Sequence, residues 1–345
     1  MGRFQKIGKI LKDIMFLFFL FVIVFVIVFF SWIFFPGSKK QNKSIVWGVN
    51  FSQRQAESLG LDWQKVYLAL LNDLKFKHLK ISVDWDLIEK RKGEYDFNDL
   101  DWQVKKAAEN KADIILAIGL KTPRWPECHQ PVWLKNKKYL DEEGERDLLE
   151  YMKKVVERYK DSKAVIGWQV ENEPFFHFGK CPKTKKNLLE REVQLVKSLD
   201  PEKPIIITDS GEFSFWFRAA AIGDLVGITM YKKIWFKELN SYITYFFPPL
   251  FYYKRAFLVK KIFGKKVICT ELQAEPWGPR LLSDNLPLSE QEKTMNLSYL
   301  ERNIDFAKRT GLDTFYFWGS EWWYWLKTKQ NKPEIWQKIK ETISG

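Results

Sequence analysis

Two kinds of segment alternate along residues 44–345: short, almost wholly apolar runs and longer runs in which apolar positions recur at spacings of three and four. The short runs are rich in Val, Ile and aromatic residues, as expected for strands buried on both faces of a parallel sheet. They predict eight strands, at residues 44–50, 78–83, 113–118, 164–171, 204–208, 225–230, 265–270 and 313–318.

The longer runs have the spacing of amphipathic helices. They occupy residues 62–75, 99–111, 141–160, 184–199, 289–310 and 332–344. Eight strands that alternate with helices predict an α/β fold, a (β/α)₈ barrel over residues 44–345. A doubly wound open sheet fits a smaller number of strands, and the Gly-rich phosphate loop of such folds does not follow the first strand.

The N-terminal segment has a different pattern. Residues 14–35 carry no charge, and their number is about the ~20 that a helix needs to cross a bilayer. Bulky Phe34 and Phe35 end the run in place of the small residues of a cleavage site, which favours an uncleaved signal anchor. We therefore expect a single-pass membrane protein with a basic cytoplasmic tail (1–13), a transmembrane anchor (14–35), a linker (36–43) and a domain outside the cytoplasm (44–345).

The composition and charge indicate which kinds of ligand the protein can bind. The formal charge is +13, but the basic residues are spread along mixed Lys/Glu faces, which favours a solvated surface over nucleic-acid binding. The aromatic fraction of 17%, with 16 Trp, fits either a thick core or a surface that stacks on sugar rings. The three histidines, His78, His129 and His177, lack the spacing of metal ligands, so neither a metal nor a cofactor is expected.

In a (β/α)₈ barrel the residues just past the carboxyl ends of the strands form the functional site. Strands four and seven lie nearly opposite one another, so Glu173 and Glu271 are expected to meet across the barrel. Two such carboxylates can cleave a glycosidic bond, one as proton donor and the other as nucleophile, and a separation of ~5 to 5.5 Å implies retention. The other positions at strand ends are Asn172, Tyr231, Trp318 and Glu321.

Three segments carry a family resemblance: "GWQVENEP" (167–174), "VICTELQAEPW" (267–277) and "LKISVDWDLIEKRKGEYDFNDLD" (79–101). Over residues 45–345 they resemble the retaining glycoside hydrolases of clan A, which include cellulases, mannanases, xylanases and β-galactosidases. The resemblance implies Glu173 as general acid/base and Glu271 as nucleophile. It further implies Asn172 as partner of the sugar 2-hydroxyl, Tyr231 as hydrogen-bond donor to the nucleophile and Trp318 as platform under the sugar.

One position departs from the clan pattern. Many members have an arginine in strand two where this chain has Lys80, which keeps the positive charge but loses the planar two-donor fork. Glu171 is expected to have a structural or substrate-orienting role, whereas Glu275 and Glu321 are expected at the rim, where they bind substrate or face solvent. The tryptophans in loops at the catalytic end are expected either to stack on sugar or to pack: Trp125, Trp133, Trp277, Trp322 and Trp323.

Two further expectations concern the loops. Cys128 and Cys181 follow strands three and four at the same end of the barrel, which predicts a disulfide between them and leaves Cys269 as a buried thiol. The aromatic segment 242–263 fits a helix that covers the barrel, and the alternative is an apolar, basic-edged surface that rests on a membrane.

The leading hypothesis is a membrane-anchored retaining glycosidase that cleaves β-glycosidic bonds of an oligo- or polysaccharide outside the cytoplasm. It contacts the bilayer through residues 14–35. A transglycosylase of the same clan and a non-catalytic carbohydrate-binding barrel are the alternatives.

Overall fold

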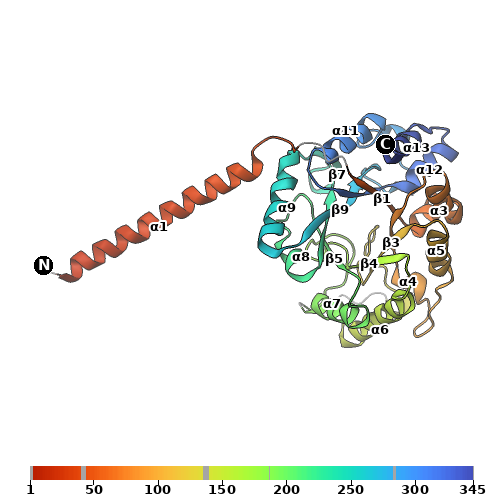
Figure 1. Cartoon of the computed structure of the whole chain (residues 1–345), viewed down its shortest axis with the longest axis horizontal. Coiled ribbons are helices and arrows are strands. Elements are labelled where there is room, and N and C mark those ends of the chain that lie inside the picture. Colours follow the sequence, from red (N-terminus) through yellow and green to blue (C-terminus); the bar gives the residue numbers. More distant parts are fainter. Residues whose placement is uncertain (1–2, 40–43, 135–139, 186, 283–284, 345) are drawn as a thin grey trace.

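A computed structural model describes residues 3–39, 44–134, 140–185, 187–282 and 285–344 (Figure 1). Residues 1–2 of the predicted tail and 40–43 of the predicted linker lie outside this range. Eight parallel strands form a closed barrel in the order β1-β10-β9-β6-β5-β4-β3-β2, which confirms the predicted (β/α)₈ fold. Their bounds are β1 Val46–Phe51, β2 His78–Ser82, β3 Asp113–Ile118, β4 Val165–Val170, β5 Ile205–Asp209, β6 Leu225–Met230, β9 Lys266–Gln273 and β10 Thr314–Trp318.

Helices surround the barrel (Figure 1). Their N-termini follow local capping rules: Asp62 accepts hydrogen bonds from two N–H groups at the start of α3, and Asp141 accepts one from Gly144 in α6. The bounds are α2 Gln53–Ser58, α3 Trp63–Asn72, α4 Trp85–Ile88, α5 Asn98–Glu109, η1 Val132–Leu134, α6 Glu142–Tyr159, α7 Leu188–Leu199, α8 Phe217–Ile222, α9 Pro249–Phe263, α10 Leu288–Gln291, α11 Leu297–Lys308, α12 Ser320–Lys329 and α13 Glu334–Ser344.

Two predicted segments divide further. The helix expected over 289–310 consists of α10 and α11, because Asn296 caps a new helix with its side chain on the N–H of Tyr299. The segment 242–263 begins in a hairpin, β7 Lys233–Phe236 and β8 Ser241–Thr244 joined by η2 Lys237–Leu239, and only then enters α9. Pro249 is the first residue of α9, where its missing N–H leaves no hydrogen bond unmade.

The barrel interior is filled by side chains. Ile115, Ile206, Ile268 and Tyr316 form one buried cluster. Gly48 of β1 pairs with Tyr316 of β10, and a Cβ at Gly48 would lie 2.5 Å from the tyrosine ring. The absent side chain on β1 therefore makes room for the large ring on its neighbour.

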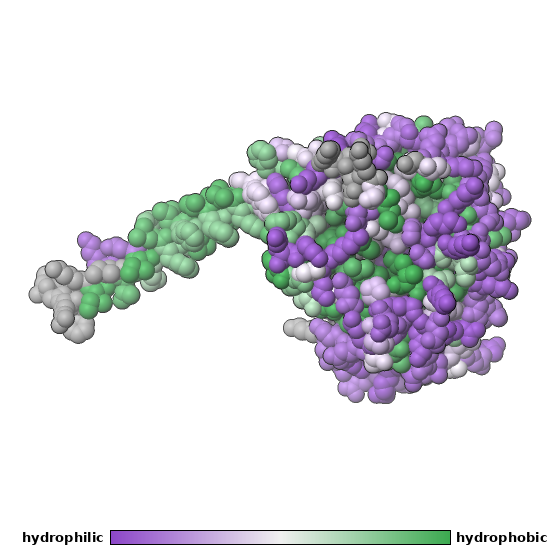
Figure 2. All heavy atoms as spheres, in the orientation of Figure 1, coloured by the Kyte–Doolittle hydropathy of each residue, from purple (hydrophilic) through white to green (hydrophobic). Residues whose placement is uncertain are grey.

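The N-terminal helix α1, Arg3–Phe34, projects away from the barrel on the side of α8 and α9 (Figure 1). Among the described residues, its portion Leu11–Phe34 is the one helix long and apolar enough to cross a membrane. Figure 2 shows it as an apolar rod. Such a helix at the N-terminus fits a membrane anchor or a signal sequence.

A pair of substitutions in β4 tests the packing of the barrel. Trp168 is fully buried and its indole N–H donates to Asp200 (2.9 Å), whereas Ile166, two residues earlier, is 37% exposed. Trp168→Ala is expected to lower the free energy of unfolding by about 3–5 kcal/mol, because it leaves a cavity. Urea-induced unfolding of the detergent-solubilised chain measures the change. The control Ile166→Ala should cost markedly less, and equal losses would contradict this packing.

Candidate active site

Glu271 and Glu173 are both buried at the end of the barrel where the strands terminate. The register of β9 slips against both of its neighbours around Glu271: Cys269 and Glu271 pair with Ile228 and Thr229, and β10 shows a matching slip. One extra residue in β9, Thr270, therefore forms a β-bulge. A bulge changes the direction of the following side chain and is common beside active sites.

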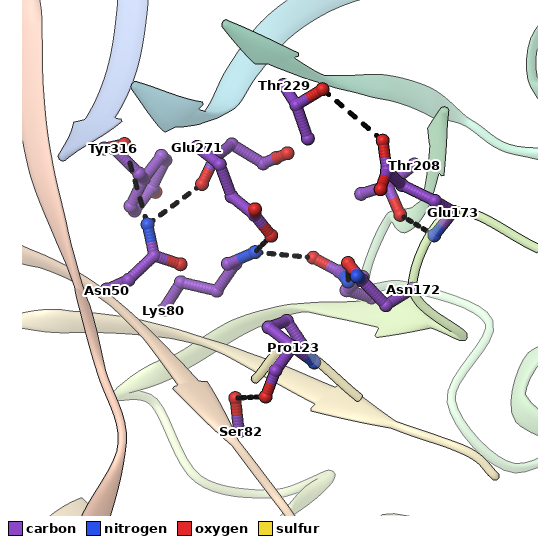
Figure 3. A network of polar contacts seen from close by, with 12 residues as sticks. Asn50, Lys80, Ser82, Pro123, Asn172, Glu173, Thr208, Thr229, Glu271 and Tyr316 are labelled. Carbon is purple, nitrogen blue, oxygen red and sulfur yellow. Dashed lines mark hydrogen bonds and ion pairs between the residues drawn. The ribbon is translucent and has the colours of Figure 1, made fainter. Parts of the chain in front are cut away.

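Each carboxyl oxygen of Glu271 has a partner, one on β2 and one just past the end of β6. Lys80 Nζ of β2 lies 3.2 Å from Oε1 and also donates to Gln169 Oε1 (3.1 Å), as Figure 3 shows. The hydroxyl of Tyr231 lies 3.1 Å from Oε2. Burial, and next the charge of Glu271, raise the pKa of Tyr231 well above its usual value, so this hydroxyl remains a proton donor. Lysine thus occupies the position expected from the sequence, with one ammonium shared between two acceptors.

The backbone after β4 explains why two glutamates so close in sequence lie in different places. Glu171 and Glu173 both have positive φ, 59° and 42°, so the strand alternation of side chains does not apply to them. Glu171 accepts hydrogen bonds from the backbone N–H groups of Leu120 (2.6 Å) and Lys121 (2.9 Å). It therefore holds the start of the loop after β3, which agrees with the structural role expected for it.

Glu173 is in a different environment. Its N–H donates to Thr208 Oγ1 (2.7 Å), and its carboxyl oxygen Oε1 lies 3.3 Å from Thr229 Oγ1 (Figure 3). Burial raises the pKa of Glu173 well above its usual value, and the nearby charges of Glu271 and Glu127 raise it further. Lys121 opposes the shift. The carboxyl group is therefore kept protonated to a higher pH than an ordinary glutamate.

Two glutamates at this end of the barrel were not predicted from the sequence. Glu127 accepts a hydrogen bond from Asn172 Nδ2 (3.0 Å), and burial raises its pKa to about 7. Glu212 accepts from the N–H of Tyr231 (2.9 Å) and the hydroxyl of Tyr252 (3.0 Å), and burial raises its pKa to about 7 as well. Glu212 lies three residues past the end of β5, so its position at a strand end could have identified it as a site residue. Glu127 lies far from a strand end, within a loop, and no sequence pattern identifies it.

Glu275 and Glu321 do not face solvent, which was one of the two alternatives expected for them. They are 7% and 0% exposed, and both form ion pairs with Arg124, at 2.8 Å for Glu321 Oε2. The Arg124 guanidinium also lies 4.0 Å from the centre of the Trp318 ring. Arg124, which the sequence pattern did not single out, therefore supports Trp318 and compensates two buried carboxylates.

The predicted tryptophans fall into two groups. Trp277 packs edge-on against Tyr231 (5.1 Å between ring centres), and Trp125 is 40% exposed beside Phe178. Trp133 instead packs against Trp85 (5.8 Å) and donates to the carbonyl of Glu89. Trp322 and Trp323 are also buried. Their indole N–H groups donate to the side chain of Gln291 and to the carbonyl of Ala274.

The cysteines and His129 lie in the loops near the candidate active site or in the barrel wall. The structure pairs Cys128 with Cys181 and leaves Cys269 as a buried thiol, the arrangement that the sequence predicted. His129 lies close to Asp84 and Asp86, with potential ligand atoms within 4.8 Å of one another. However, Arg54 already contacts both aspartates, at 2.9 and 2.5 Å, and supplies the positive charge there.

Comparisons with known proteins agree with this fold. Residues 64–192 match the family model "Glycosyl hydrolase family 10". The chain is 26% identical to "Beta-galactosidase BgaA" of Clostridium cellulovorans over 46% of its own length, and 37% identical to "Probable mannan endo-1,4-beta-mannosidase A" of Aspergillus niger over 18%. It spans only 27% and 16% of the length of these two relatives.

Solved structures show the same fold at low identity. Xylanase 10B of Thermotoga petrophila has a TM-score of 0.55 at 17% identity, with 86% of this chain and 94% of that chain covered. The GH5_18 protein of Streptomyces cattleya, solved with GlcNAc, has a TM-score of 0.55 at 14% identity, with 82% and 71% covered. The resemblance to clan A (β/α)₈ glycoside hydrolases is thereby confirmed.

The buried ion cluster gives a second test of stability. Arg124→Met should lower the free energy of unfolding by about 3–5 kcal/mol, because Glu275 and Glu321 would be left buried without a cation. The triple variant Arg124→Met, Glu275→Gln, Glu321→Gln should recover much of the loss in urea-induced unfolding. Arg91→Met removes an exposed ion pair with Glu94 and serves as the control. A triple variant as unstable as the single one would contradict this account.

Proposed function

We propose that the protein is a membrane-anchored glycoside hydrolase that cleaves β-glycosidic bonds with retention, by double displacement. One observation carries the proposal: two buried glutamates, one in β9 and one just past the end of β4, have unlike surroundings. Glu271 receives two hydrogen bonds of the kind that an anion accepts, while burial and neighbouring carboxylates favour the protonated form of Glu173. Carboxyl groups that differ in this way are suited to separate acid and nucleophile roles.

The two steps follow from these roles. In the first, Glu271 attacks the anomeric carbon while Glu173 gives its proton to the leaving oxygen, which forms a covalent glycosyl-enzyme and releases the first product. In the second, the Glu173 carboxylate takes a proton from water, the water oxygen attacks the anomeric carbon, and the bond to Glu271 breaks. Glu173 is then protonated again.

The remaining residues support these two. Lys80 and Tyr231 hold Glu271 in place, and Asn172 is positioned by Gln169 and Glu127 to bind the sugar 2-hydroxyl. Trp318, fixed by Arg124, forms the floor under the sugar, with Trp277 and Trp125 beside it. Glu321 acts through Arg124 and not on the substrate, and Trp133 packs against Trp85 of α4.

The location is part of the proposal. Residues 1–13 form a cytoplasmic tail, 14–35 cross the membrane, 36–43 are a linker, and 44–345 act on an oligo- or polysaccharide outside the cytoplasm. The uncharged run of residues 14–35 supports the membrane anchor, and a disulfide between Cys128 and Cys181 suits an oxidising environment.

Trapping of the covalent intermediate tests the proposed chemistry. A panel of activated 2-deoxy-2-fluoro glycosides, which form slowly hydrolysed glycosyl-enzymes, should label the full-length chain. Mass spectrometry of peptides should find the sugar on Glu271, and Glu271→Gln should abolish labelling. Glu275→Gln, a nearby buried carboxylate that the mechanism does not use, is the control and should still be labelled.

Labelling of Glu275 or Glu173 in place of Glu271 would contradict the assigned roles. A folded chain that binds sugars but is labelled by none of the panel would favour a non-catalytic carbohydrate-binding barrel.

The pH dependence of activity tests the role of Glu173. Its protonated form is active in the first step, so kcat/KM should fall as the pH rises through its raised pKa. The charge of Glu127 contributes to that raised pKa. Glu127→Gln removes the charge, lowers the pKa of Glu173, and is expected to move the basic limb of the profile to lower pH.

Glu94→Gln, which removes an exposed carboxylate on the loop after β2, should leave the profile unchanged. A basic limb that moves to higher pH in Glu127→Gln, or does not move, would contradict the assignment of Glu173 as the acid.

A further inference from the structure

Aromatic rings form a continuous row from the candidate active site to the end of α1. Tyr231, the partner of Glu271, contacts Trp277, and the last ring, Phe247, contacts Phe34 of α1 (6.1 Å between ring centres). Neighbouring rings along the row have centres 5.4 to 6.4 Å apart. We call these rings the aromatic row: Trp277, Phe178, Phe176, Phe213, Tyr245 and Phe247.

The end of α1 is fixed against the barrel. Phe29 and Phe30 pack on Phe215 (6.0 and 6.3 Å), and Ile33 is fully buried. Lys254 of α9 donates to the carbonyl of Trp32, one of the carbonyls that a helix end leaves without an intrahelical partner. The helix therefore meets the domain at a defined place, next to the aromatic row.

The length of α1 gives the level of the bilayer. The charge-free part of α1, residues 14–34, has 21 residues, about 32 Å of helix at the usual rise, and the hydrocarbon layer is about 30 Å thick. Because this length nearly equals the thickness of the layer, the end of the run, Phe29–Phe34, lies toward the outer edge of that layer. This is the part that contacts Phe215 and Phe247, so one end of the aromatic row lies at the membrane surface.

Part of the row and the residues beside it are exposed although they are apolar. Phe213 is 59% exposed, Phe176 is 36%, and Phe246, next to Phe247, is 90% exposed. Contiguous exposed apolar surface marks a site of interaction. Figure 2 shows apolar surface on the domain beside its junction with α1. Helix α9, which follows directly, carries basic Lys260 and Lys261 in its last turn and no acidic residue, which suits anionic headgroups.

We propose that the outer part of the aromatic row, from Phe176 to Phe247, binds the apolar part of a lipid-linked glycan at the bilayer surface, while its sugar chain passes Trp277 into the site between Glu173 and Glu271. This inference rests on the proposed glycosidase function and names its substrate class. The exposed phenylalanines of the row have no donor or acceptor for sugar hydroxyls. They continue to a helix suited to lipid, which favours a lipid chain over a polysaccharide as their occupant.

Two glycosides of one sugar test the proposal, the sugar being the one whose fluoro derivative labels Glu271. One is a water-soluble methylumbelliferyl glycoside, and the other is a hexadecyl glycoside held in nanodiscs with the full-length chain. Phe213→Ser should lower kcat/KM for the hexadecyl glycoside about tenfold, the order expected for lost contact with one aromatic ring, and leave the soluble glycoside little changed.

Val132→Ser is the matched control, because Val132 is 73% exposed in η1 and belongs to none of the ring contacts of the row. It should change neither rate. Equal losses on both glycosides in Phe213→Ser would identify the row as a sugar-binding platform, and no loss on either would remove it from function. Both results overturn the proposal.

A second measurement does not depend on activity. Phe246→Cys and Val132→Cys are each labelled with an environment-sensitive fluorophore; the native thiol, Cys269, is fully buried. Spin-labelled lipid in the nanodisc should quench the probe at 246 and not at 132. Absence of quenching at 246 overturns the proposed contact with lipid. Quenching without trapped sugar or hydrolysis of either glycoside would instead refute the glycosidase function, and the substrate class with it.

Discussion

Compensation of buried negative charge governs the end of the barrel where Glu271 lies. Lys80, Lys121 and Arg124 face a larger number of buried carboxylates, which include Glu127, Glu171, Glu173, Glu271, Glu275 and Glu321. A carboxylate without a partner in a low-dielectric site either costs stability or takes up a proton. The distribution of the three cations therefore decides which groups are anions and which are acids.

Each cation has a distinct assignment. Lys80 lies on Glu271, Arg124 joins Glu275 to Glu321, and Lys121 contacts Glu127 (3.6 Å) and the carbonyl of Glu173 (3.3 Å). No carboxylate-to-cation contact comparable to that of Glu271 is formed by Glu173 among the described residues. Burial is the main cause of the raised pKa of Glu173, and the charges of Glu271 and Glu127 add to it.

The pattern of the sequence predicted the parts of this arrangement that depend on strand ends. Apolar runs predict the buried parallel strands directly. Because the functional site of a (β/α)₈ barrel lies at the carboxyl ends of its strands, these strands then locate Glu173, Tyr231, Glu271 and Trp318. Lys80 was identified through the family resemblance, because many clan members have an arginine in strand two where this chain has a lysine.

Loop conformation limited the rest of the prediction. Arg124 and Glu127 lie in a long loop with positive φ at both residues, 95° and 75°, and nothing in the local pattern shows where such a loop directs its side chains. The ion pairs of Glu275 and Glu321 were not predicted for the same reason, since their partner Arg124 was not known. The hairpin of β7 and β8 was missed because aromatic residues such as Trp235 and Tyr242, which pair across it, also suit a covering helix.

The disulfide between Cys128 and Cys181 makes the barrel mouth sensitive to redox conditions. Cys128 immediately follows Glu127 and closes the loop that also carries Arg124, so a covalent tie completes the wall on that side. Thiols form such a tie only in an oxidising compartment. The conformation of this half of the barrel mouth therefore depends on the redox state of the surroundings as well as on folding.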